Sequence, residues 1–201
     1  QSQEEYHGLP TGFVDLDKML GGMHGSDLMI VAARPGMGKT SFLMSVMRHV
    51  ALRAKKSVVF FSLEMGNDQI MQRLLSQESG IDSRKIRDGR LAPDELQSLL
   101  ISMDNIGDTR LYLDDTLGIT PAALRSKCQK LKRETDIDLV IIDYLQLMTG
   151  DLFKDNRVQE VSYISRNLKI LAKELNVPIL TAAQMSRSVE QRADKLPMLS
   201  D

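Results

Sequence analysis

The sequence has little of several features that would assign a protein to a functional class. Among 201 residues there is one cysteine, Cys128, so an internal disulfide is excluded, and the three histidines are too scattered to form a zinc site with it. There is no tryptophan, and aromatic residues make up only 4% of the chain. The chain is therefore poorly equipped to stack successive nucleic-acid bases on aromatic platforms.

The chain also lacks an excess of charge and a long apolar run. Its 26 Lys and Arg against 27 Asp and Glu give a net charge of −1, so any nucleic-acid contact must be local or multiplied by oligomerisation. No stretch approaches the ~18 consecutive apolar residues of a membrane helix. The start at Gln1 has neither an initiator Met nor the pattern of a signal peptide. We expect a cytoplasmic piece of a longer protein, with no membrane partner.

Short apolar runs without alternating polarity predict the fold class. They occur at residues 28–33, 58–63, 111–113, 139–142 and 179–183. Apolar spacing typical of helices covers residues 13–20, 42–54, 70–79, 93–106, 124–131 and 158–175. This pattern predicts an α/β fold with a mostly parallel central sheet covered by helices on both faces. We expect one domain, with a linker and short helix in 1–26, a core in 27–183 and a loop in 184–201.

A glycine-rich turn lies between the first predicted strand and the next helix. Residues 33–40 read Ala-Arg-Pro-Gly-Met-Gly-Lys-Thr, a P-loop pattern with Ala33 in place of the usual first glycine. Glycines let backbone N–H groups turn toward phosphate oxygens, and the helix adds its positive dipole end. The predicted nucleotide contacts are Arg34, Pro35, Gly36, Met37, Gly38, Lys39, Thr40 and Ser41. A turn that binds nothing is the alternative.

Four side chains are candidates for the chemistry beside that turn. Lys39 would reach the terminal phosphates, and the Thr40 hydroxyl would bind Mg²⁺. Asp143 ends an apolar strand and suits the magnesium shell, although it could instead cap the following loop. Glu64 follows another strand and is the general-base candidate, with a first-turn helix residue as the alternative. We interpret Asp114 and Asp115 as loop and cap residues.

Several ordered motifs closely resemble the RecA-like motor domain of DnaB-type bacterial replicative helicases. The resemblance runs almost the whole length and includes the P-loop, Ser62-Leu-Glu-Met65 and Ile141-Ile-Asp-Tyr-Leu-Gln-Leu147. It continues with Ala183-Gln-Met-Ser-Arg187. Further matching segments are 9–12, 15–17, 21–22, 189–192 and 197–201.

The resemblance implies an ATP-dependent motor. It implies a homo-hexameric ring on single-stranded DNA, with ATP and Mg²⁺ between subunits and 5′→3′ unwinding at the replication fork. By resemblance Lys39 and Thr40 match the P-loop lysine and metal ligand, Glu64 the catalytic glutamate, and Asp143 the Walker B carboxylate. Gln184 matches the glutamine that senses the γ-phosphate.

The resemblance also implies partners and segments outside these residues. Family members carry an amino-terminal helical domain that contacts primase and the helicase loader. They continue beyond Asp201 to an arginine finger, which contributes about 10³–10⁵ in rate. We therefore expect the 201 residues alone to bind nucleotide and hydrolyse it slowly.

Two cationic segments are candidates for contact with DNA. They lie after the Asp143 strand and after Gln184, and a few cations per subunit would neutralise many phosphates around a ring. The candidates are Lys154, Arg157, Arg187, Arg192 and Lys195. Plain solvated loops are the alternative for these segments.

Other functions remain open at this point. A RecA-superfamily ATPase that does not unwind DNA, such as a RadA-like recombination factor or a KaiC-like clock ATPase, would share the P-loop and Asp143. An ATP-gated module that only opens or closes a ring is a third possibility.

Overall fold

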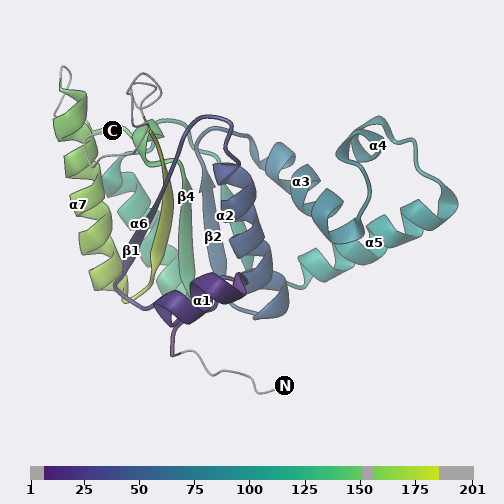
Figure 1. The fold of residues 1–201 in the computed structure, drawn as a ribbon, viewed down its shortest axis with the longest axis horizontal. Coiled ribbons are helices and arrows are strands. Elements are labelled where there is room, and N and C mark those ends of the chain that lie inside the picture. The colour runs from purple at the N-terminus through teal and green to yellow at the C-terminus, as the bar shows by residue number, and fades with distance from the viewer. Residues whose placement is uncertain (1–6, 151–155, 186–201) are drawn as a thin grey trace.

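The computed structural model describes residues 7–150 and 156–185. A five-stranded sheet lies at its centre, with every neighbouring pair parallel and the strand order β1-β5-β4-β2-β3 (Figure 1). The strands are β1 (Leu28–Ala33), β2 (Val58–Ser62), β3 (Leu111–Asp114), β4 (Leu139–Asp143) and β5 (Ile179–Gln184). The predicted strands are therefore confirmed, and β5 includes Gln184, which the sequence placed in the following loop.

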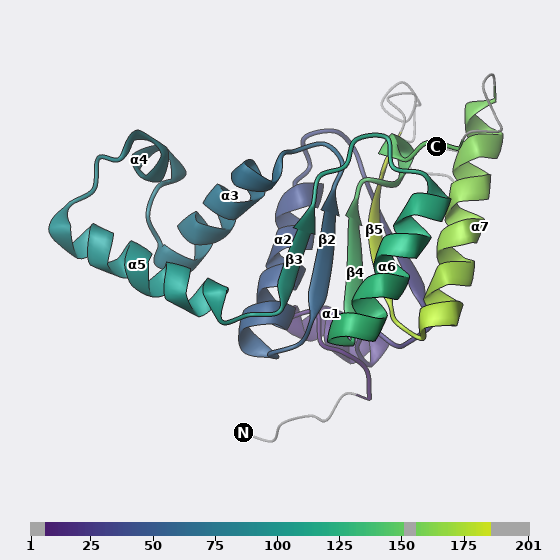
Figure 2. The same cartoon turned by 180° about the vertical axis from the view of Figure 1, so that it is seen from behind.

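Helices cover both faces of this sheet, as predicted. Figure 1 shows α2 in front of the strands, and Figure 2, from behind, shows α6 and α7 on the opposite face. The helices are α1 (Val14–Leu20), α2 (Lys39–Arg48), α3 (Asn67–Ser79), α4 (Ser83–Asp88), α5 (Pro93–Gly107), α6 (Pro121–Thr135) and α7 (Arg157–Leu175). A π-helical turn, His49–Arg53, extends α2, and the 3₁₀ turn η2 spans Leu145–Leu147.

The apolar strands explain why both faces are covered. Successive side chains of a strand point to opposite faces. In β4, Val140 and Ile142 join the apolar core under α6 and α7, whereas Ile141 joins the core under α2 and α3. All five residues of β4 are buried. The sheet can therefore exclude water only if it carries helices on both sides.

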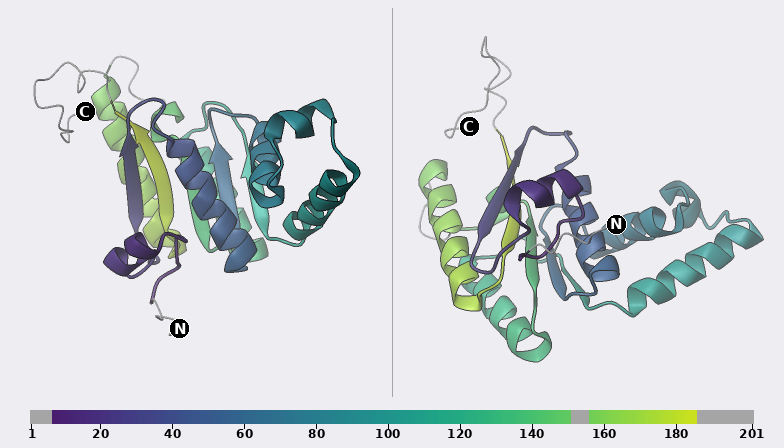
Figure 3. Two further views of the ribbon diagram at one scale, coloured as in Figure 1. Left: turned by 45° about the vertical axis from the view of Figure 1, so that its right-hand side comes forward. Right: turned by 60° about the horizontal axis from the view of Figure 1, so that its bottom comes forward.

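The segment between β2 and β3 forms a helical insertion. Figures 2 and 3 show α3, α4 and α5 beside the β3 edge of the sheet. Pro93 opens α5 as predicted, but the sequence missed α4. This helix has six residues and buries none of them, so it leaves no apolar periodicity. It is defined instead by its ends, where the Asp82 side chain accepts a hydrogen bond from Arg84 N at 2.7 Å and Gly89 adopts a left-handed conformation.

A buried carboxylate fixes the turn before β1. Asp17 in α1 is 3% exposed and accepts hydrogen bonds from the Thr11 backbone N–H at 2.8 Å and the Thr11 hydroxyl at 2.7 Å. The Gly12 N–H donates to the same carboxylate at 3.2 Å. A buried charge is tolerated where several donors satisfy it. The motif around these residues is therefore structural, at the amino ends of the strands.

Helix α6 packs an apolar face against the core and also forms an ion pair with β3. Leu124 and Cys128 are fully buried, as its spacing predicted. Lys127 forms an ion pair in which its ammonium is 2.5 Å from a carboxylate oxygen of Asp114. This contact lowers the pKa of Asp114 despite the opposing effect of burial. Asp115 accepts a hydrogen bond from Asn67 N at 3.0 Å, so both carboxylates are structural, as expected.

None of the helices in the described part of the chain combines the length and hydropathy needed to cross a lipid bilayer.

The two-sided core gives a direct test of stability. Leu43 on α2 is fully buried, whereas Leu100 on α5 is 52% exposed. We expect Leu43→Ala to lower the free energy of unfolding by about 2–5 kcal/mol, because it removes apolar contacts and leaves a cavity. The matched change Leu100→Ala should cost less than about 1 kcal/mol. Urea titration followed by circular dichroism measures both, and equal losses would contradict the assignment of the core.

The thiol of Cys128 gives a second test. Burial, with a smaller effect from Asp114, raises the pKa of Cys128 to about 12. The thiolate is the reactive form, so at pH 8 the folded protein should react with Ellman's reagent at least about 100-fold more slowly than a free thiol. Denaturation in urea should restore ordinary reactivity. Rapid labelling of the folded chain would show that the α6 face is not packed as described.

Candidate active site

The turn between β1 and α2 has the backbone shape of a phosphate cradle. Gly36 and Gly38 have φ values of 77° and 84°, a left-handed region that favours glycine. Gly38 immediately precedes α2, so the first N–H groups of the helix open toward the turn. This arrangement of N–H groups and helix dipole suits an anion. The structure therefore gives the predicted P-loop residues the expected conformation.

Lys39 connects the turn to two acidic residues. Its Nζ donates hydrogen bonds to Glu64 Oε2 at 2.9 Å and to Asp143 Oδ1 at 3.0 Å. It also lies 4.3 Å from the centroid of the Tyr144 ring, within reach of a cation–π interaction. Although β5 separates β1 from β4 in the sheet, the turn carries Lys39 across to the end of β4.

The ammonium of Lys39 is held in its charged form. Burial alone would lower its pKa, but the hydrogen bonds to Glu64 and Asp143 and the charges of these two groups together raise the pKa above its usual value. The side chain is only 10% exposed. The site therefore keeps a desolvated positive charge beside the cradle.

Asp143 and Thr40 form a compact pair of oxygen groups. Asp143, at the carboxyl end of β4, is fully buried, and its Oδ2 accepts a hydrogen bond from the Thr40 hydroxyl at 2.7 Å. A carboxylate and a hydroxyl are the ligand types that Mg²⁺ takes when phosphates and water supply the rest of its shell. Asp143 contacts Lys39 and Thr40 directly, which goes against the interpretation that it only caps the loop.

Glu64 lies at the more open side of this cluster. It follows β2, and its side chain is 49% exposed. Glu64 and Thr40 border a cavity of about 430 Å³ that continues onto the helical insertion. The other lining residues are Met65, Gln69, Gln72, Arg73 and Ser83. Of the two carboxylates that contact Lys39, Asp143 is fully buried, whereas Glu64 has access to water, as a general base requires.

Gln184 is brought to the start of the P-loop by the sheet. It is the register partner of Ala33, and the following N–H, of Met185, donates to Ala33 O at 2.9 Å. On its other side Gln184 is paired with the side chain of Gln146. The sheet thus places Gln184 at the same edge as Lys39 and Asp143.

The predicted DNA contacts are mostly outside the described residues. Lys154, Arg187, Arg192 and Lys195 belong to that group. Arg157 is described, at the first position of α7, and it is not part of the Lys39 cluster. Its guanidinium donates to Gln146 O and forms an ion pair with Glu160.

Sequence reasoning missed three residues near the site. Tyr144 and Gln146 follow Asp143 in a motif that served only to identify the family, and Arg73 lies in the insertion. For Tyr144 and Gln146, their position shortly after Asp143 in the sequence could have indicated that they lie near the site. Arg73 gave none, since it becomes a neighbour of Glu64 only when α3 folds against the sheet.

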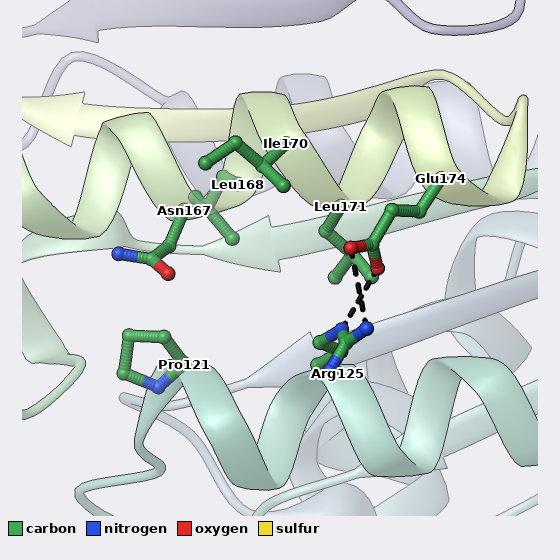
Figure 4. Close-up of a pocket in the computed structure, with 7 residues that line it drawn as sticks. All are labelled: Pro121, Arg125, Asn167, Leu168, Ile170, Leu171 and Glu174. Atoms are coloured by element: carbon green, nitrogen blue, oxygen red, sulfur yellow. Dashed lines mark hydrogen bonds and ion pairs between the residues drawn. The ribbon is translucent and has the colours of Figure 1, made fainter.

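A second hollow lies on the opposite face, between α6 and α7. It has a volume of about 260 Å³. Figure 4 shows Arg125 and Glu174 reaching toward each other across it, and their shortest contact is 2.8 Å. None of the predicted site residues lines this hollow.

Comparison with known sequences assigns the family. The profile of the DnaB-like helicase C-terminal domain matches residues 8–201. The chain is 46% identical over 198 residues to the replicative DNA helicase DnaB of Geobacillus stearothermophilus, covering 98% of this chain and 44% of that protein. It is 47% identical over 195 residues to the replicative DNA helicase DnaC of Bacillus subtilis (strain 168), covering 96% and 43%. The chain thus spans less than half the length of these relatives.

Solved structures agree with the sequence comparison. A structure described as an ATPase domain superposes with a TM-score of 0.92 at 35% identity, covering 100% of this chain and 72% of that one. A DnaB-like replicative helicase, described with its interactions with primase, gives a TM-score of 0.90 at 35% identity, covering 98% and 48%. The predicted RecA-like fold is confirmed, and the chain belongs to the DnaB-like helicase C-terminal domain family.

Proposed function

We propose that this chain is the motor domain of an ATP-dependent replicative DNA helicase, which hydrolyses ATP to translocate 5′→3′ on single-stranded DNA. The observation that carries the proposal is the convergence of Lys39, Thr40, Glu64 and Asp143 at one edge of the sheet. Family membership over residues 8–201 supports the same activity.

ATP and Mg²⁺ are the proposed cofactors, and the residues present fit them. The contacts of the cradle with the nucleotide are assigned to residues 34–41, and Thr40 and Asp143 would hold the metal ion. When bound, Mg²⁺ would neutralise charge that develops on the phosphates. Among the described residues no three His, Cys, Asp or Glu side chains gather as a metal site. The protein would thus supply few ligands, in keeping with the preference of Mg²⁺ for phosphate and water.

Each side chain of the site receives a role from its surroundings. Lys39, already charged and desolvated, would exchange its carboxylate partners for phosphate oxygens. Glu64, which is half exposed, would orient and deprotonate the attacking water. Gln184, beside Ala33, would sense the terminal phosphate.

The proposal includes a homo-hexameric ring with nucleotide at its subunit interfaces. In this proposal, groups of a neighbouring subunit would enter the cavity of about 430 Å³ beside Glu64. A ring also explains how a chain with net charge −1 could bind DNA, because the same few cations recur in every subunit. The proposed contacts remain Lys154, Arg157, Arg187, Arg192 and Lys195.

Primase and a helicase loader are proposed partners, through an amino-terminal domain or the ring. Primase is named in the description of one structural relative. We place the protein in the bacterial cytoplasm, at the nucleoid. The recombination, clock and ring-gating alternatives share the P-loop, but the helicase family profile matches nearly the whole chain and favours the helicase.

The assignment of Glu64 predicts a separation of binding from turnover. In the full natural chain, Glu64→Gln should lower the rate of ATP hydrolysis by about 10²–10⁴-fold, because the amide cannot accept a proton from water. Binding of a fluorescent ATP analogue with Mg²⁺ should remain, because the cradle, Lys39 and Thr40 are unchanged. Steady-state hydrolysis and fluorescence titration measure the two quantities.

The matched control is Glu134→Gln on α6. The side chain of Glu134 is 57% exposed, and its ion pair with Lys130 is long, at 4.0 Å. This variant should hydrolyse ATP at the parental rate. Full turnover by Glu64→Gln, or equal losses in both variants, would reject Glu64 as the general base.

A further inference from the structure

The carboxyl end of β5 extends beyond its neighbour β4. The two strands pair from Val140 opposite Ile179 to Ile142 opposite Thr181, and β5 then continues to Gln184. Its other edge stays paired with β1 up to Ala33. The last residues of β5 therefore need a new hydrogen-bonding partner on the β4 side.

The side chain of Gln146 provides this partner. Its Nε2 donates to Gln184 O at 2.9 Å, and its Oε1 accepts from Gln184 N at 3.2 Å. A carboxamide has the donor and acceptor of a peptide group, so it can substitute for a strand residue. Both backbone groups of Gln184 that face β4 are thus satisfied by one side chain.

The backbone of Gln146 makes a second connection. Its carbonyl oxygen accepts from the guanidinium of Arg157, at the beginning of α7. A line of hydrogen bonds therefore runs from Ala33 O to the N–H of Met185, through the Gln184–Met185 peptide group to Gln146, and on to Arg157. It joins the start of the P-loop to a proposed DNA contact.

We propose that Gln146 is a positioning residue that couples the nucleotide site to DNA binding. The inference rests on the proposed function, since it assumes that nucleotide and DNA both bind. Gln146 contacts neither ligand in this account. Gln146 transmits a change at Gln184 to Arg157, because its side chain is hydrogen-bonded to Gln184 and its backbone carbonyl is hydrogen-bonded to Arg157.

The test compares single-stranded DNA binding by the full natural chain in two nucleotide states. The measured quantity is the ratio of the Kd for an oligo-dT in ADP to that in a non-hydrolysable ATP analogue. Gln146→Glu keeps the shape of the side chain and its acceptor but cannot donate to Gln184 O. Gln146→Met removes both hydrogen bonds. Gln97→Glu and Gln97→Met, at an exposed position of α5, are the matched controls.

We expect the Kd ratio to fall toward one in both Gln146 variants, a loss within the roughly 5–150-fold range typical of coupled sites. The Gln97 variants should keep the parental ratio. A merely structural role would lower the melting temperature but leave the ratio unchanged. If Gln146→Met does not fold, Gln146→Glu decides.

Two results would overturn the inference, and they differ. A parental ratio well above one that persists in folded Gln146 variants rejects the role of Gln146 alone. A parental chain that does not bind oligo-dT in either nucleotide state rejects the proposed function, and the inference with it.

Discussion

The ammonium of Lys39 lies between a fully buried carboxylate, Asp143, and a half-exposed one, Glu64. Burying Asp143 without a partner would cost several kcal/mol, so the fold must hold a cation and donors against it. Thr40 supplies the other hydrogen bond. This cluster connects the P-loop turn and the first turn of α2 to the carboxyl ends of β2 and β4.

The strand order makes the cluster possible. In a parallel sheet all carboxyl ends share one edge, so side chains that follow different strands can meet there. With β5 between β1 and β4, the residue that ends β5, Gln184, lies beside the P-loop. Because β5 extends beyond the end of its pairing with β4, the backbone of Gln184 can form hydrogen bonds with the side chain of Gln146. Nucleotide chemistry and its proposed link to DNA therefore arise from one topological feature.

Local patterns predicted much of this arrangement. Apolar runs located the strands, and the P-loop with the strand-ending Asp143 predicted the candidate site. The short helix α4 was missed because caps define it and nothing in it is buried. The pairings of Lys127 with Asp114 and of Gln146 with Gln184 join residues 13 and 38 positions apart. Such contacts depend on tertiary packing, so neither periodicity nor motif spacing indicates them.

We propose that the cluster around Lys39 drives a DNA motor. The most direct measurement is strand displacement by the full natural chain on forked DNA with a single-stranded 5′ or 3′ loading tail, with Lys39→Ala as the comparison. We expect ATP-dependent displacement that requires the 5′ tail and is lost in Lys39→Ala. Displacement retained by Lys39→Ala, or none by a parent that hydrolyses ATP, would contradict it.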